Sequence, residues 1–440
     1  MPLEVAIVGS GIAGLGAAIA LKDHPGIRVQ LYEKAKALRE IGASIALGPN
    51  GMRALDRLGV KNGLSPDIAL RNKSGHPMVY RDYRTNEIVA QDARQDDGDE
   101  LHWTARYYRP DLQKALAVHI DTADIHLDKA FSSVAWDESL KKLVIQFADG
   151  SSATADILLG SDGVRSAVRT FFDPSTKAEW SGWVAFRSVF PKTHVADILK
   201  TFDDPNEAVH VWGPEGNSLF YSPLGRDLFT VVGSTQIPNS DSKDAPYSNT
   251  EWESEGNLAA LRALYNGPGW GPVVHSLVEH TPNVQVYPNA AYPQVLDSWI
   301  LGDKQTQTLP YGRVTVAGDA AHAHGGAHAA GGSLALDDAW AFATALKHIY
   351  PADDASRDGP LPSDAQILKA LQLYEKTRRV HTDKVIKTVH AGNEAKKERA
   401  RRGTVDTDDE LLARIQNRKD TTWIHAHDVV AAFNAAVKDF

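Results

Sequence analysis

The first residues of the chain contain the feature that most limits its possible folds, an apolar run followed directly by a glycine-rich turn. Residues 5–8 are apolar, and Gly9, Gly11 and Gly14 follow with the spacing G-x-G-x-x-G. In this pattern the first glycine permits a tight turn, the second lets the backbone approach a pyrophosphate, and the third lets the next helix pack closely on the strand. The N-terminus of that helix attracts phosphate. The sequence therefore predicts a strand, a turn and a helix that bind a dinucleotide.

A second predicted strand, at residues 29–32, ends at an acidic residue. This residue is Glu33, which comes about 20 residues after the glycine-rich turn, at the position where a carboxylate can accept a hydrogen bond from a ribose hydroxyl. An acid here favours FAD or NAD over NADP at this site. It does not distinguish FAD from NAD.

Composition and charge exclude several classes of function. The chain of 440 residues has no Cys, which excludes disulfides, thiolate metal sites and cysteine nucleophiles. Its formal net charge of -9 argues against general electrostatic binding of nucleic acid. No apolar run approaches the roughly 18 residues of a membrane-spanning helix, and no basic leader precedes the first strand. We therefore expect a cytoplasmic protein without a nucleic-acid or membrane partner.

Two later predicted strands also end beside a glycine and an acid. Residues 157–159 lead to Asp162 and Gly163, and residues 314–317 lead to Gly318 and Asp319. A strand end of this kind with a helix behind it suits close approach to a ligand, although a single Asp-Gly pair is more often only a turn.

The middle of the chain has a different pattern. Between residues 180 and 233, short apolar runs alternate with turn sequences at 213–216 and 224–227, which predicts an antiparallel sheet. We expect helices at residues 252–265 and 333–349 and a charged helical region from residue 363. The basic run at 396–402 is expected to be a solvated helix face.

Together, the Gly9, Asp162-Gly163 and Gly318-Asp319 motifs, in this order and at these intervals, resemble those of the single-component FAD-dependent aromatic hydroxylases, the salicylate hydroxylase and p-hydroxybenzoate hydroxylase family. The resemblance extends from the first strand to about residue 350. It implies an α/β fold in which residues 1–175 and 286–360 form a three-layer, Rossmann-like FAD-binding domain. Residues 176–285 would form an inserted antiparallel-sheet substrate domain, and residues 361–440 a C-terminal helical region.

The resemblance implies non-covalent FAD as the cofactor. By analogy Glu33 holds the ADP half, Arg39 and Arg109 contact the flavin side, and Asp319 binds the ribityl chain, while Asp162 shapes the region shared by flavin and nicotinamide. The expected cofactor-binding residues are Gly9, Gly11, Ala13, Gly14, Glu33, Lys34, Arg39, Arg109, Asp162, Gly318, Asp319, Gly331 and Gly332. The family has no separate nicotinamide fold, which accounts for the lack of a second glycine fingerprint.

Residues 321–332 depart from the commoner family pattern, in which a proline follows the first histidine. This segment is similar to that of the fungal dearomatising phenol hydroxylases of the tropolone and azaphilone type. His322, His324 and His328 are candidate substrate contacts. We do not expect a metal site, because no neighbouring acid or Cys completes one.

In that group an arginine and a tyrosine on the substrate sheet hold a phenolate, and Arg187 and Tyr221 are the best positional matches. Arg187 shares a predicted strand face with Trp183, Ala185 and Val189, where an unpaired charge would be costly. A structural arginine that reaches solvent or pairs elsewhere on the sheet is the alternative.

The resemblance implies a monooxygenase that inserts one oxygen from O2 into a phenolic ring through a flavin hydroperoxide, with or without dearomatisation. NADH or NADPH would be the reductant, and the protein would be a monomer or a homodimer. A salicylate-type decarboxylating hydroxylase is the nearest alternative, since the same arginine could bind a carboxylate. An FAD-dependent reductase or oxidase and a non-catalytic flavin-binding protein are alternatives of other classes.

Overall fold

Strand β1 (Leu3–Val8) lies in the middle of the first large sheet of the computed structural model, which describes residues 2–38, 42–95, 98–248, 250, 254–267, 269–302, 311–353 and 360–440. Within these residues the strand order is β19-β20-β12-β1-β2-β8. The other strands are β2 (Ile27–Tyr32), β8 (Ile125–His126), β12 (Ile157–Gly160), β19 (Ile300–Leu301) and β20 (Val314–Val316). All neighbours are parallel except β19 and β20. The strands predicted from the four apolar runs are confirmed.

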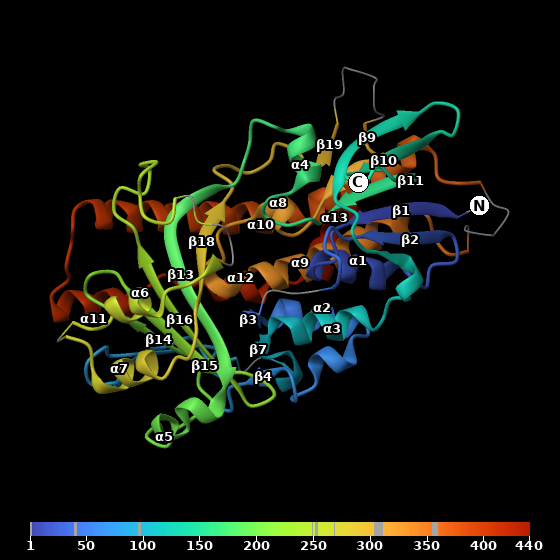
Figure 1. Cartoon of the computed structure of the whole chain (residues 1–440). Coiled ribbons are helices and arrows are strands. Elements are labelled where there is room, and N and C mark those ends of the chain that lie inside the picture. The colour runs from blue at the N-terminus through green and yellow to red at the C-terminus, as the bar shows by residue number, and fades with distance from the viewer. Residues whose placement is uncertain are drawn as a thin grey trace.

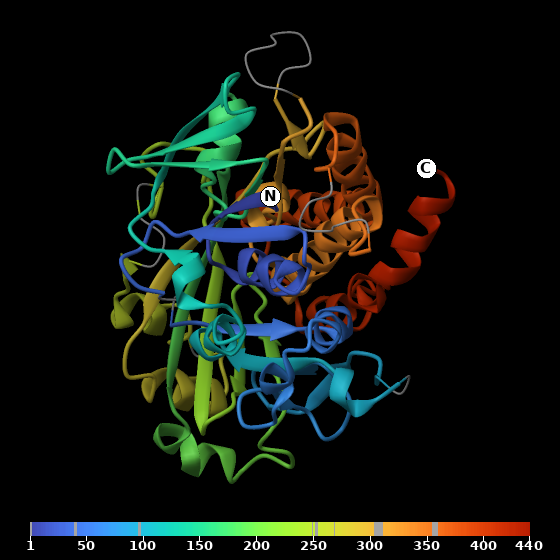
Figure 2. The ribbon, with the colours of Figure 1, turned by 90° about the vertical axis from the view of Figure 1, so that its right-hand side faces the viewer.

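Layers on both faces bury this sheet, which explains why its strands are continuously apolar. One face packs against helices α1 (Ile12–Leu21) and α9 (Gly331–Ile349), and α10 (Asp364–Arg401) packs on α9. On the other side lies a three-stranded sheet of β9 (Phe131–Asp137), β10 (Lys142–Phe147) and β11 (Ser152–Ala155) (Figures 1 and 2). The predicted three-layer α/β architecture is confirmed.

The second large sheet lies beside the first and is antiparallel except for the β14–β5 pair (Figure 1). Its order is β17-β18-β13-β16-β15-β14-β5-β6. The strands are β5 (Val79–Arg81), β6 (Ile88–Gln91), β13 (Glu179–Pro191), β14 (Val209–Trp212), β15 (Ser218–Pro223), β16 (Leu228–Gln236), β17 (Ser254–Glu255) and β18 (Gln285–Ala291). We call it the substrate sheet, after the role predicted for it.

The substrate sheet takes strands from outside the predicted range of 176–285. Strands β5 and β6 come from the region assigned to the cofactor domain, and β18 extends to Ala291. Strands β5 and β6 are short, and a short strand with little alternation of apolar and polar residues is hard to recognise in a sequence. They extend the sheet beyond β14, whose edge would otherwise be unpaired.

A fourth, small sheet is formed by segments between residues 44 and 108. It has the order β3-β7-β4, formed by β3 (Ser44–Leu47), β4 (Leu70–Arg71) and β7 (Ala105–Tyr108). The remaining helices before residue 330 are α2 (Pro49–Arg57), α3 (Arg109–Ala117), α4 (Ala167–Phe172), α5 (Ala196–Leu199), α6 (Leu258–Ala263), α7 (Pro272–Glu279) and α8 (Asp319–His322).

The helix predicted at residues 252–265 is wrong in its first part. Residues 254–255 form strand β17, and α6 begins only after Asn257, whose side chain accepts a hydrogen bond from the N–H of Ala259. This cap ends the extended segment and starts the helix. Residues 251–253 lie outside the described residues.

The C-terminal region is helical, as predicted. After α10 come α11 (Asp408–Gln416), α12 (Thr422–Ala426) and α13 (Val429–Lys438). Helix α10 begins with a capping box between Ser363 and Gln366, and α13 packs against both α10 and α9, so that the C-terminus lies on one flank of the molecule (Figure 2). Among the residues described, no helix is both long and apolar enough to cross a membrane.

Candidate active site

The glycine-rich turn between β1 and α1 has the geometry that the sequence predicts. Gly9 has φ +104°, and a Cβ there would lie 2.5 Å from the carbonyl oxygen of Ser161. A Cβ on Gly14 would lie 2.0 Å from the oxygen of Gly9, whereas one on Gly11 would meet nothing within 4 Å. Gly9 and Gly14 are therefore required for packing, and Gly11 leaves open the space that an approaching pyrophosphate needs. Ala13 lies against Gly318 on the neighbouring strand end.

Glu33 lies at the carboxyl end of β2, beside the glycine-rich turn. Its carboxylate accepts hydrogen bonds from the backbone N–H of Ser10 and of Ala35, each at 2.9 Å. These two bonds fix the carboxylate at the turn, where its remaining lone pairs could accept a ribose hydroxyl. Lys34 is exposed, and no hydrogen bond or ion pair with a described residue ties it to the turn. Arg39 lies outside the described residues.

Asp162 lies against the same turn, since its Cα would be 2.8 Å from a Cβ on Gly9. Its carboxylate accepts hydrogen bonds from Ser166 and from the N–H groups of Ala167 and Val168 at the start of α4. Burial raises the pKa of the Asp162 carboxyl, although these bonds oppose the shift. Asp162 therefore orders its own loop, and its contribution to the cofactor side stays a prediction.

The Gly318-Asp319 motif directly follows β20 and lies beside the start of α9. Gly318 has φ +60°, which suits glycine, and its N–H donates to Asp338 at 2.8 Å. The Asp319 side chain is exposed, and a Cβ on Gly331 would lie 3.7 Å from its carboxylate. A Cβ on Gly332 would clash with Leu47 and Ile45 of β3. The predicted cofactor residues of three distant segments thus meet at one place.

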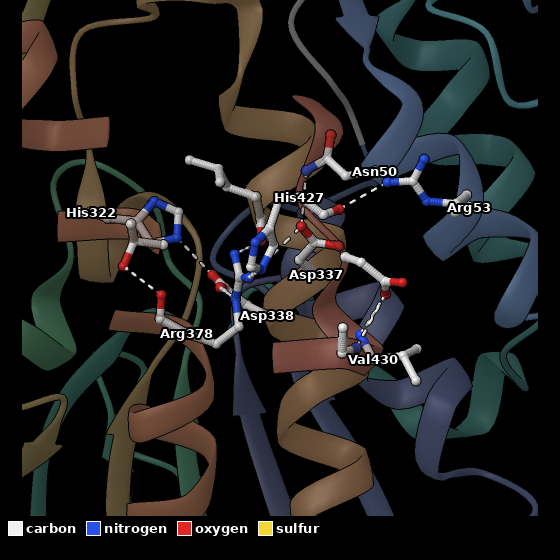
Figure 3. Close-up of polar contacts among 12 residues, drawn as sticks. Asn50, Arg53, His322, Asp337, Asp338, Arg378, His427 and Val430 are labelled. Carbon is white, nitrogen blue, oxygen red and sulfur yellow. Dashed lines mark hydrogen bonds and ion pairs between the residues drawn. The ribbon is translucent and has the colours of Figure 1, made fainter. Parts of the chain in front are cut away.

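A fully buried ionic network holds this motif from behind (Figure 3). The Asp338 carboxylate lies 2.6 Å from His322 Nε2 and 2.7 Å from Arg378 Nε, and all three side chains are inaccessible to solvent. Burial by itself would raise the pKa of Asp338, but His322 and Arg378 outweigh it and lower the pKa to about 2. His322 therefore belongs to this network. The prediction that it contacts substrate is wrong, because its ring is fully buried and its Nε2 is bonded to α9.

The network continues toward the C-terminal segment. Asp337 accepts a hydrogen bond from Asn50 at 2.8 Å, and burial raises the pKa of its carboxyl to about 6. Arg378 reaches His427 at 3.1 Å, and the ring of His427 stacks on His381 with centroids 3.9 Å apart. Sequence reasoning missed this cluster, because its members are far apart in the chain and follow no shared motif.

His324 and His328, the other two histidines of residues 321–332, lie in the loop before α9. His324 is buried beside Gly331, its Nδ1 lies 3.1 Å from the His322 carbonyl, and its Nε2 has no partner among the described residues. His328 is exposed with φ +56°, and its carbonyl lies 3.1 Å from His425 Nε2. Desolvation, with Lys396 nearby, lowers the pKa of His328 to about 4. No group of His, Asp or Glu in the described part of the chain has a metal-binding arrangement.

Arg187 lies in β13, on the face of the substrate sheet that meets the cofactor loops. The direct pairs Arg187–Val232, Val232–Phe220 and Phe220–His210 place these four side chains on one face, which we call the Arg187 face. A Cβ on Gly326 would lie 3.7 Å from the Arg187 guanidinium, so the loop before α9 closes over it.

The Arg187 guanidinium makes no hydrogen bond or ion pair with the part of the chain that is described, and its Nε is buried without a partner. Burial lowers the pKa of Arg187, and Arg109 adds repulsion. Its ring contact is Tyr287 on β18, 5.3 Å away and on the same face, a residue that sequence reasoning missed. No pattern marks Tyr287, because only the β13–β18 pairing brings it beside Arg187.

Tyr221 does not share this face. It pairs with Val209 and Val231, so its side chain points to the opposite side of the sheet from Arg187. There it is 1% exposed and its hydroxyl donates to Asn86 at 3.3 Å. The prediction that Tyr221 and Arg187 hold one phenolate is therefore wrong, because the sheet's register separates the two side chains.

Comparison with known proteins places this arrangement in a family. The family described as "FAD binding domain" matches residues 2–241 and 282–358, which is most of the chain. The chain belongs to this family. The open space at Gly11, the fixed carboxylate of Glu33 and the exposed Asp319 fit its cofactor, FAD, and the enzyme is a flavin-dependent aromatic hydroxylase by its family and relatives.

Curated relatives cover nearly the same length. The FAD-dependent monooxygenase eupB from Phoma sp is 29% identical, over 86% of this chain and 85% of that protein. The 6-hydroxynicotinate 3-monooxygenase of Bordetella bronchiseptica is 28% identical, over 88% and 90%. A solved structure of a salicylate hydroxylase substrate complex superposes with a TM-score of 0.76 at 22% identity, covering 99% of this chain and 98% of the other. This last likeness confirms the fold.

Proposed function

We propose that this enzyme hydroxylates a phenolic ring whose oxygen lies beside Arg187. FAD, once reduced by NADH or NADPH, supplies the oxygen derived from O2. The protein's task is to hold the ring ionised and oriented. A phenol has a pKa near ~10, and a cation nearby typically lowers it by ~1 to 3 units. Arg187 would make the ring more electron-rich in this way, which an electrophilic oxygen requires.

The observation that carries the proposal is the unpaired guanidinium of Arg187. A charge whose Nε is buried without a partner is costly, so the retention of Arg187 calls for an anion that the described residues do not supply. The charges that act on Arg187 come from Tyr287 and Arg109, and neither is a carboxylate. The loop at Gly326 and the ring of Tyr287 flank the guanidinium, and this partial burial would strengthen its interaction with a bound phenolate.

Decarboxylating hydroxylation of a salicylate-like acid is the second candidate. The planar fork of Arg187 suits a carboxylate as well as a phenolate. A relative named salicylate hydroxylase asL1, from Sarocladium schorii, is 28% identical over 86% of this chain. Release of carbon dioxide from a salicylate would separate this reaction from simple hydroxylation.

The test is to load the protein with FAD and screen phenols for stimulated oxidation of NADH and NADPH. A productive phenol is then supplied with isotopically labelled O2. We expect one labelled oxygen atom in the aromatic product. Substrate-stimulated oxidation that yields no labelled product would instead identify a reductase or an oxidase. FAD binding with no stimulated oxidation across the screen would identify a flavin-binding protein without this activity.

A further inference from the structure

A lysine of the C-terminal region lies over the substrate sheet. Helix α10 passes across the end of the sheet near the start of β13, as Figure 1 shows. The Lys396 ammonium on this helix lies 4.5 Å from the ring centroid of Trp183. Trp183 belongs to the same side of β13 as Arg187, since the residues are four positions apart in regular pairing with β16. Lys396 has the exposure that the sequence predicts for residues 396–402, and it also contacts a ring of the substrate sheet.

Lys396 has no anionic partner, although its helix neighbours have one. Lys397 pairs with Glu394 and Arg399 with Asp406, whereas no hydrogen bond or ion pair joins Lys396 to another described residue. The residue itself is exposed to solvent. The surrounding protein nevertheless lowers the pKa of its ammonium by burial, and Arg414 adds repulsion.

Among the described residues, no carboxylate is one of the charges that act on Lys396. Its charge acts on His210 of the Arg187 face and on His328 of the loop before α9, and burial lowers the pKa of both imidazoles. An ammonium over an aromatic ring gains some stabilisation from the ring alone. That contact leaves its hydrogen-bond donors without a partner among the described residues, and Lys396 is near enough to the loop before α9 for its charge to act on His328.

We propose that Lys396 binds a second, acidic group of the substrate, at a distance from the ring oxygen held by Arg187. At ~3.3 Å per strand residue, Trp183 and Arg187 are about 13 Å apart along β13. The inference rests on the proposed function and makes its substrate class more specific. The substrate would be an elongated phenol that carries a carboxylate on a side chain, with its apolar middle along Trp183, Ala185 and Val232.

The test uses the FAD-loaded protein and two matched probes, hexylresorcinol and the same molecule with a carboxylate at the end of its alkyl chain. Affinity is read without reductant, from the change in flavin absorbance on titration. An ion pair with an exposed lysine should make the wild-type protein bind the acid about 2- to 5-fold more tightly than the neutral probe. Lys396→Met should remove this preference and leave the neutral probe unaffected, and Lys396→Arg should retain it.

Lys397→Met is the control, because this neighbour already has Glu394 as its partner. The control should keep the full preference for the acid. Equal binding of the two probes by the wild-type protein, or an unchanged preference in a folded, FAD-loaded Lys396→Met variant, would overturn the inference and leave the proposed function intact. Failure of every phenol in the earlier screen, together with failure of both probes to bind, would overturn the proposed function and the inference together.

Discussion

The charges behind Gly318 and the charges on the Arg187 face of the substrate sheet are arranged in opposite ways. Behind Gly318, Asp338 contacts both His322 and Arg378, and each charge has an opposite or hydrogen-bonding partner. On the Arg187 face, Arg187 and Lys396 have no carboxylate partner among the described residues. The difference suggests that paired charges here maintain the fold, whereas unpaired charges await an anionic ligand.

The largest expected effect comes from removing the charge of Asp338, which pairs with His322 and Arg378. Asp338→Asn should destabilise the protein by about 3 to 5 kcal/mol, because it leaves Arg378 buried without its main partner and weakens the support of Gly318. Thermal unfolding and FAD content are the measurements. Asp337→Asn is the comparison and should cost less, about 1 to 2 kcal/mol, since the amide can still accept the Asn50 hydrogen bond and the ion pair that it loses with Arg378 is longer, at 3.7 Å. Equal losses in the two variants would contradict the distinction between the two acids.

Removal of the unpaired cation should instead affect catalysis. Arg187→Met should keep the fold and the FAD, with an unfolding temperature at or above that of the wild type, because no protein ion pair is lost. Turnover of a phenol should fall about 10- to 1000-fold if ~1 to 3 pK units of phenolate stabilisation persist in the transition state. Arg187→Lys should recover only part of the activity, because it lacks the planar fork. An unfolded, flavin-free Arg187→Met protein would support a structural role.

The exposed acid of the cofactor motif provides a third test. Asp319→Ala should weaken FAD binding by about 10- to 100-fold, because hydrogen bonds from ribityl hydroxyls to a carboxylate are lost. The unfolding temperature without FAD should change little, since the side chain is exposed. Equilibrium titration with FAD checks both expectations. A variant that retains FAD as the wild type does would show that Asp319 has another role.

The smallest expected effect is a loss of folding stability at acidic pH, which comes from histidines beside the Asp338 network. Burial lowers the pKa of His427 to about 4 and of His381 to about 2, below the ordinary value of 6.5. The unfolded chain therefore binds more protons below pH 6.5, and stability should fall as the pH decreases through this range. Asp337, with its pKa raised to about 6, opposes the loss as it takes up a proton in the folded state, but it is one group against two.

His381→Phe isolates this effect. Its two ring nitrogens have no partner among the described residues, so the substitution removes a titrating group without losing a hydrogen bond. The variant should unfold at a higher temperature than the wild type at pH 5, by a few degrees, with little difference at pH 7.5. A parallel pH dependence in the two proteins would show that His381 does not contribute to the acid sensitivity.

The fold could be predicted from sequence because its main signals are local. The buried strands read as continuous apolar runs, and the three glycines of the turn keep the spacing G-x-G-x-x-G within one strand-turn-helix unit. The candidate site was only partly predictable. Alternation within β13 placed Arg187 on a face with Trp183, but the relation of that face to Tyr221 depends on the register between strands. A register shift of one residue would move Tyr221 to the other face of the sheet, and no local sequence pattern fixes the register between strands.

The contacts that sequence reasoning missed join segments that are distant in the chain. His322 meets Asp338 and Arg378 only because α8, α9 and α10 pack together. Lys396 looked like any solvated lysine of a basic run, and only the path of α10 over β13 brings it to Trp183. Helical periodicity describes which residues share a face of α10, but it cannot say which sheet that face meets.

The contribution of β5 and β6 to the substrate sheet has a consequence for chimeric enzymes. A graft that exchanges only the central segment, residues 176–285, would leave β14 paired with the host's own β5 and would divide β18 at its first residue. The Tyr80–His210 ring contact would then join side chains of two parents. Exchange of substrate preference between relatives therefore requires transfer of two segments with four junctions, residues 79–91 and a central piece extended to the end of β18.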